Sequence, residues 1–222
     1  MDRKSARFAS TTADELINRL VNDLEPVKPL RLAVGLCLVF GALLASATGV
    51  GLMLGLRPDI PAGRLAPHLV LESGLFLLLG LSAAANVVRM SRPHVGSDYG
   101  GSNWAMAMTA LLPVSALVMG LGRGAIGLSP MDMRSGINCL GSGVLWGSLT
   151  LTALIMWLRR GAPVRPHYAA LLSGVAAGSL GMFAYSLHCP SNDVVHIGLW
   201  HSGAVALSAL IARLVVPPLI RW

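Results

Sequence analysis

Six stretches of this chain are apolar over about twenty residues each, which is the length an α-helix needs to cross the hydrocarbon core of a bilayer. Only 12% of the residues are charged, against about 25% in a soluble domain, and eleven of the charged residues lie within residues 1–31. The rest are too few to solvate a globular surface. The sequence therefore predicts an all-α, polytopic membrane protein, with a short N-terminal segment at 1–31 and a transmembrane domain at 32–222. The six spans are expected at about 32–54, 69–88, 104–121, 138–158, 167–187 and 197–217.

The distribution of Lys and Arg predicts the orientation, because these residues accumulate in the loops that stay in the cytoplasm. With six spans, thirteen Lys/Arg fall on the side that carries both termini and four on the other side. Both termini are therefore expected in the cytoplasm. The hairpin loops near 57–68, 122–137 and 188–196 then face the opposite compartment. The formal charge of +7 is attributed to this topology, and direct nucleic-acid binding is not expected.

The N-terminal segment contains a stretch with helical periodicity that ends before Pro26. Thr12 and Glu15 have the spacing of a capping box at its start. Its apolar face could pack on another protein, on the chain's own loops or on the membrane. An acidic polar face disfavours anionic lipid, so a protein partner is the preferred interpretation. The residues of this face are Leu16, Ile17, Leu20, Val21 and Leu24.

Two cysteines and several histidines are expected at the outer ends of the last three spans. Cys139 begins the fourth span and Cys189 follows the fifth, close to His188 and His196. Cys and His together are ligands for soft transition metals, but no tight Cys/His motif is present, so metal binding stays open and no cofactor is predicted. The alternatives are a role in sensing metal or oxidant, a structural disulfide, and two unreactive buried thiols.

Three further polar residues are expected at membrane depth or near it, where ionisable groups tend to be functional. Glu72 lies one turn inside the second span, where it could pair with Arg57 or with a nearby His. His201 lies one turn inside the sixth span and could hydrogen-bond across helices. A haem would require facing pairs of His, and only His201 is suitably placed.

Small residues recur at a spacing that allows helix backbones to approach closely in lipid. The preferred interpretation is packing within a six-helix bundle. A homo-oligomer formed through one of these faces is the alternative. The pairs are Gly51/Gly55, Gly143/Gly147 and Gly174/Gly178.

Several short motifs occur in an order and spacing that characterise one family. They are Asp14-Glu15-Leu16-Ile17, Leu24-Glu25-Pro26-Val27, Gly55-Leu56-Arg57-Pro58-Asp59, Glu72, Cys139, Arg159-Arg160-Gly161-Ala162-Pro163, His188-Cys189-Pro190 and Trp200-His201-Ser202-Gly203-Ala204. In these motifs the chain resembles the negative regulators of sigma factor F, which are six-span anti-sigma factors of the bacterial inner membrane. The resemblance covers nearly the whole chain.

The resemblance implies a regulatory protein and not an enzyme. The cytoplasmic N-terminal segment would hold an extracytoplasmic-function sigma factor at the membrane, and a metal or oxidant stress on the periplasmic side would release it. The residues leave two alternative functions. A small transporter or channel would need a continuous polar path, which the spans do not supply. A membrane thiol oxidoreductase would need two pairs of cysteines or a quinone site, and only two outward cysteines are present.

Overall fold

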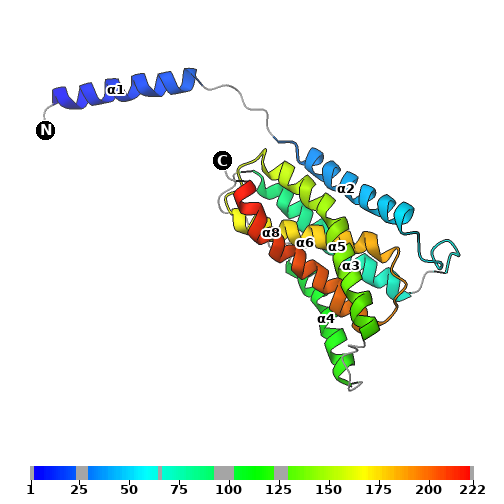
Figure 1. The fold of residues 1–222 in the computed structure, drawn as a ribbon. Helices are drawn as coiled ribbons and strands as arrows, with labels where there is room; N and C mark the ends of the chain where they lie inside the picture. Colours follow the sequence, from blue (N-terminus) through cyan, green and yellow to red (C-terminus); the bar gives the residue numbers. More distant parts are fainter. Residues whose placement is uncertain (1–2, 24–29, 65–66, 93–102, 123–129, 221–222) are drawn as a thin grey trace.

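The structure is a computed structural model, and it describes residues 3–23, 30–64, 67–92, 103–122 and 130–220. The secondary structure in these ranges is helical, which confirms the predicted all-α class (Figure 1). The elements are α1 (Arg3–Asn22), α2 (Leu32–Met53), α3 (Pro67–Met90), α4 (Asn103–Gly122), α5 (Pro130–Leu158), α6 (Pro166–Ser186), α7 (Val194–His196), the π-helical turn η2 (Ile197–His201) and α8 (Ser202–Leu219).

Five described segments are long and apolar enough to cross a bilayer, as the predicted membrane protein requires. They are Leu32–Met53, Leu69–Met90, Met133–Leu158, Pro166–Ser186 and Val194–Leu219. The expected span at 104–121 corresponds to α4, which contains Pro113 and whose apolar described part is the shorter stretch Pro113–Gly122. The count of six spans therefore stays a prediction.

The helix ends gather at two ends of the bundle (Figure 1). At the first, called the Arg92 end, the Arg92 side chain donates to the carbonyl of Leu30 over 2.8 Å, and the amide of Ala162 donates to the carbonyl of Ser91 over 3.0 Å. At the second, called the Cys139 end, the amide of Arg57 donates to the carbonyl of Leu187 over 2.9 Å. Helix α3 ends at the Arg92 end and α5 begins at the Cys139 end, so the chain between them, which includes α4, passes from one end to the other.

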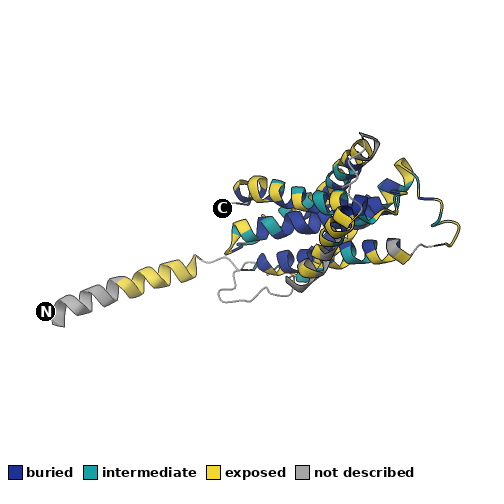
Figure 2. Ribbon diagram, turned by 90° about the horizontal axis from the view of Figure 1, so that it is seen from below, coloured by how far each residue is buried: buried dark blue, intermediate teal, exposed yellow. Residues whose placement is uncertain are grey.

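Helix α6 is the buried centre of the bundle: 89% of its membrane-spanning window is buried, against 28% for α2. It packs against α3, α5 and α8 (Figure 1), and the buried residues gather on the inside of the bundle (Figure 2). Its sequence is rich in Ala, Gly and Ser. Helices with such small side chains can approach closely in lipid, where packing rather than the hydrophobic effect drives association.

The expected small-residue pairs lie mostly at crossings inside the molecule. A Cβ added to Gly147 would lie 2.5 Å from the carbonyl oxygen of Ala177, and one added to Gly174 would lie 2.4 Å from that of Ser208. Gly143 and Gly178 are equally crowded, by Met182 and Val205. Gly55 instead occupies a turn at φ +83°, a conformation that favours glycine. The pairs Gly143/Gly147 and Gly174/Gly178 are therefore explained by packing within one chain, whereas a Cβ added to Gly51 would meet only Leu56, at 3.5 Å.

Helix α1 stands apart from the bundle (Figure 1), and its described side chains at 13–23 are all exposed. Leu16 and Leu20 are 58% and 60% exposed, while Leu24 lies outside the described residues. One expectation was wrong: α1 begins at Arg3, so Thr12 lies inside the helix and does not cap it. The preceding residues include Arg, Lys and Ala and neither Gly nor Pro, so nothing in them stops the helix from extending.

The crossing of α6 and α8 yields a test of the fold. Gly174→Val places two methyl groups against the backbone of α8, so it should destabilise the protein by about 1–3 kcal/mol or more, as overpacking does. Gly141→Val is the matched control, because a Cβ there meets nothing within 4 Å. Thermal unfolding in mild detergent measures both variants. Equal midpoints would contradict the close crossing.

Candidate functional site

A wide helical turn places two histidines on one face at the Cys139 end. In an α-helix, residues five apart point about 140° away from each other. In the π-helical turn η2, hydrogen bonds close between residues five apart, so His196 and His201 come nearly into line. Their rings lie 5.7 Å apart at 79°. The carboxylate of Asp193 accepts the backbone N–H of His196 over 3.1 Å and so fixes the start of this segment.

The two cysteines meet these histidines from neighbouring elements. Cys139 lies on α5 and Cys189 follows α6, with their sulfur atoms 3.8 Å apart. Nε2 of His196 lies 3.4 Å from Sγ of Cys139. Both cysteines are free thiols, since a disulfide requires about 2.05 Å between its sulfurs. The two Sγ atoms and one ring nitrogen from each of His196 and His201 lie within 4.8 Å of one another, and all four residues are buried. These four residues are called the thiol–imidazole cluster below.

Glu72 of α3 lies behind the cluster and contacts one of its members, His201. Its carboxylate contacts Nδ1 of His201, and both side chains are almost fully buried. The other ring nitrogen of His201, Nε2, is buried without a hydrogen-bond partner. Because Nδ1 is engaged by Glu72, Nε2 is the nitrogen that His201 turns toward the thiols.

Arg57 ties the hairpin between α2 and α3 to the segment that carries Cys189. It is only 5% exposed. Its guanidinium donates to the carbonyl of Cys189 over 3.0 Å, to Oδ1 of Asn192 over 2.8 Å and to Oδ1 of Asp59 over 2.7 Å. His188 adds a second link, with Nδ1 2.9 Å from the carbonyl oxygen of Gly55. The position of Cys189 therefore depends on the hairpin between α2 and α3.

Two groups outside the spanning segments have shifted acidities. The hydrogen bond from Arg57 holds the pKa of Asp59 below its ordinary value. The pKa of Cys189 is lowered mainly by its hydrogen-bonded neighbour Cys139, with His196 and His201 also favouring the thiolate and burial opposing it. A thiolate is the form of cysteine that binds soft metals and reacts with oxidants, so a lowered pKa at Cys189 suits either reaction.

The structure groups the predicted site residues differently from the sequence interpretation. Cys139, Cys189 and His196 come together as a set, but His188 does not offer a ring nitrogen to it. His201 joins the set, and Glu72 pairs with His201 rather than with Arg57. Sequence reasoning did not identify Asn192 as a partner of Arg57. It also missed Tyr185, whose hydroxyl lies 3.8 Å from Sγ of Cys139.

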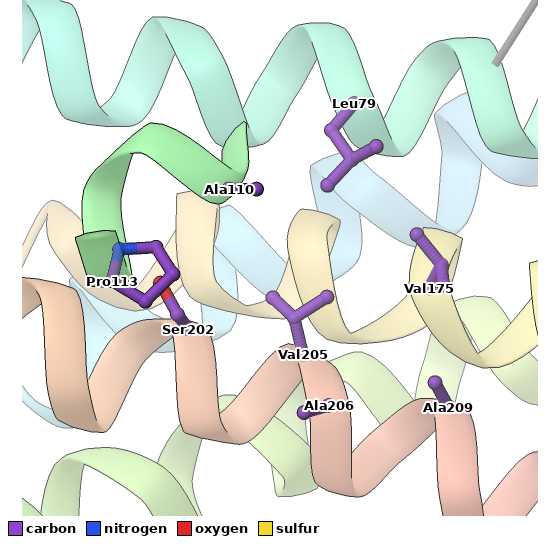
Figure 3. Close-up of a pocket in the computed structure, with 8 residues that line it drawn as sticks. All are labelled: Leu79, Ala110, Pro113, Val175, Ser202, Val205, Ala206 and Ala209. Atoms are coloured by element: carbon purple, nitrogen blue, oxygen red, sulfur yellow. The ribbon is translucent and has the colours of Figure 1, made fainter. Parts of the chain in front are cut away.

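An apolar hollow lies between α3, α4, α6 and α8 and is open on one side (Figure 3). Leu79, Pro113, Val175 and Val205 are among the residues that line it. Its surface is almost wholly carbon, which suits a hydrocarbon chain. The thiol–imidazole cluster contributes no residue to it, so the two features are separate.

The fold and site define a helical membrane protein that carries a buried thiol–imidazole cluster at one end and a free amphipathic helix on its N-terminal side. Residues 20–222 match the family described as "Negative regulator of sigma F". The chain therefore belongs to that family, a regulatory kind of protein, as its sequence motifs had indicated.

Two curated relatives agree with this assignment. The chain is 31% identical to the "Anti-sigma-F factor NrsF" of Caulobacter vibrioides, over 94% of this chain and 99% of the relative. It is 26% identical to the "Probable anti-sigma-F factor NrsF" of Azospira oryzae, over 77% of this chain and 80% of that protein. No solved structure is significantly similar to the chain.

The contacts of Arg57 predict how Cys189 is held. Arg57→Ala leaves the partners of the guanidinium unsatisfied, at a cost of about 1–3 kcal/mol. Alkylation of Cys189, read by peptide mass mapping, should therefore be roughly tenfold faster. Arg64→Ala is the control, because Arg64 lies in the same hairpin with its side chain exposed. Equal rates in the two variants would mean that Arg57 does not hold the Cys189 segment.

Proposed function

We propose that this chain is a membrane-bound anti-sigma factor of the bacterial inner membrane. Its N-terminal helix holds an extracytoplasmic-function sigma factor away from RNA polymerase. A periplasmic metal or oxidant stress at the opposite end releases the sigma factor. The observation that carries the proposal is membership of the family together with a helix, α1, that is exposed on all its described side chains.

The chemistry of α1 supports a protein partner. Leu16, Ile17, Leu20 and Val21 form one exposed apolar face, and Leu24 continues the periodicity in the sequence. Most helices in proteins gain their stability by packing an amphipathic face, so such a face is normally buried against another surface. Within the described residues 13–23 the polar side carries Asp14, Glu15 and Asp23, and the basic Arg19 pairs with Glu15 over 3.2 Å, while the first turns of α1 add the basic residues Arg3, Lys4 and Arg7. An amphipathic helix of this kind fits a hydrophobic groove on a protein partner.

The topology supports a separation of binding from sensing. In the proposed orientation both termini are cytoplasmic, because the Arg92 end carries most of the Lys and Arg. Helix α4 then supplies the crossing that the chain makes between α3 and α5. The thiol–imidazole cluster at the Cys139 end faces the periplasm, where two thiols in reach of each other tend to oxidise.

The sensing step uses the two cysteines of the cluster. An oxidant removes two electrons from the thiols, a disulfide forms and two protons leave. A thiophilic metal instead binds the sulfurs as thiolates. Either event changes the packing of α5 against the Cys189 segment. Release of the sigma factor requires that the two packing states differ in their affinity for it.

The apolar face of α1 yields a direct test. Leu16→Asp combined with Leu20→Asp removes two side chains that the bound sigma factor would bury, each worth roughly 1.5–3 kcal/mol. The sigma factor should therefore bind roughly a hundredfold or more weakly. It should no longer co-purify with the protein in mild detergent, and a reporter of its regulon should be on without stress.

A matched control adds the same two charges to the opposite face of α1. Asn18→Asp combined with Asn22→Asp changes exposed residues and should leave co-purification and reporter activity unchanged. Immunoblots of the membrane fraction verify equal protein levels. Retained binding by the Leu double variant at a normal level would exclude this face as the sigma-factor site.

Reporter fusions test the orientation separately. A reporter that is active only outside the cytoplasm should be active after residues 60 and 192 and inactive after residues 163 and 222. The physical reason is the retention of Lys/Arg-rich loops in the cytoplasm. An active fusion after residue 222 would indicate an odd number of crossings and would place the two termini in different compartments.

A further inference from the structure

We propose that Cys139, Cys189, His196 and His201 form a binding site for a thiophilic divalent cation that prefers four ligands, with Zn²⁺ as the typical ion. Glu72 is the positioning residue that orients His201. The metal site would extend the proposed sensing role of the two thiols. Only its role in signalling rests on the proposed function. Ion binding itself is a property of the purified protein, so the two proposals can fail separately.

The interatomic distances match a tetrahedral ion. With Zn–S near 2.3 Å and Zn–N near 2.0–2.1 Å, a tetrahedral site has edges of ~3.8 Å between sulfurs and ~3.6 Å between sulfur and nitrogen. The two sulfurs lie 3.8 Å apart, and Nε2 of His196 lies 3.4 Å from Sγ of Cys139. The four ligand atoms span up to 4.8 Å, so binding draws the widest pair together by roughly 1 Å. Two sulfur and two nitrogen ligands are the set that favours zinc.

The environment of His201 points independently to a ligand. The residue is 1% exposed and its Nε2 has no hydrogen-bond partner. A buried polar atom of this kind is costly unless something binds it. At the same time Nδ1 contacts the carboxylate of Glu72. A carboxylate that accepts the N–H of one ring nitrogen, leaving the other for the metal, is the usual support of a metal-binding histidine.

Charge explains why the site suits a buried location. Both sulfurs bind as thiolates, so that their two negative charges and a divalent ion sum to zero with neutral imidazoles. A neutral centre avoids the cost of an unpaired charge in a low-dielectric interior. The charge on Glu72 is directed at the N–H of His201. An ion bound here links α5 to the segment between α6 and α8.

Cobalt(II) is the probe for the experiment, because tetrahedral thiolate coordination gives it intense visible bands and a near-ultraviolet charge-transfer band. The full-length protein is purified in mild detergent with its thiols reduced. We expect one Co²⁺ per chain with both spectral features, and stoichiometric bleaching on addition of Zn²⁺. The absence of these bands from the reduced wild-type protein would by itself overturn the proposal.

Variants identify the ligands. Cys139→Ser combined with Cys189→Ser should abolish the charge-transfer band. His196→Ala and His201→Ala should each weaken Co²⁺ binding strongly and alter the visible bands, and Glu72→Gln should weaken binding about 10–100-fold. The matched controls are Cys37→Ser, which removes an exposed thiol on α2, and His167→Ala, which removes an exposed imidazole on α6 outside the cluster.

Size-exclusion profiles and circular dichroism verify that each variant is folded. A charge-transfer band that persists in the double Cys variant, or an unchanged spectrum in both His variants, would overturn the ligand set. Co-purification of the sigma factor is measured on the same preparations. If the wild-type protein shows the cobalt spectrum but no sigma factor co-purifies with it, the proposed function is contradicted and the metal site is not.

Discussion

The close approach of helix backbones around α6 is the constraint on which the rest of the structure depends. Gly147 of α5 lies against the carbonyl of Ala177, and Gly174 of α6 lies against that of Ser208 on α8. Without a hydrophobic force between helices in lipid, such contacts decide where α5 and α8 sit. They therefore also decide the separation of Cys139, which α5 carries, from His201, which precedes α8. A methyl group at the crossing would move the ligands of the site as well as the helices.

The sequence was sufficient for the elements that depend on length and hydropathy. Five of the expected spans have helical counterparts of suitable length and hydropathy, and the periodicity of Leu16, Ile17, Leu20 and Val21 placed them on one exposed face. The predicted start of α1 was wrong, because the Thr-x-x-Glu pattern formed by Thr12 and Glu15 also occurs inside helices. The span at 104–121 stays unsettled because Pro113 interrupts an otherwise apolar stretch.

The site was only partly predictable, and the reason is local geometry. The sequence interpretation grouped His188 with His196 because the two lie in the same loop, and on an α-helical wheel His196 and His201 point apart. The π-helical turn at Ile197–His201 changes that wheel, and such turns are frequent at functional sites. The pairing of Glu72 with His201 depends on how α3 packs beside this turn, which is a tertiary property. The link from Arg57 to Cys189 is likewise a contact between distant segments.

The proposed metal site and the proposed disulfide would use this cluster through different geometry. A tetrahedral ion would leave the sulfurs near their present 3.8 Å and draw the imidazoles inward, whereas a disulfide would bring the sulfurs to about 2.05 Å and leave the imidazoles without an ion. The two states exclude each other, because sulfurs joined in a disulfide are no longer thiolate ligands. In the proposal both events displace the segment that holds Cys189. That segment is hydrogen-bonded to Arg57, and Arg57 follows α2, the helix that α1 precedes in the chain. A common output for the two stresses therefore requires that both displace the Arg57 contact, whichever atoms they bring together first.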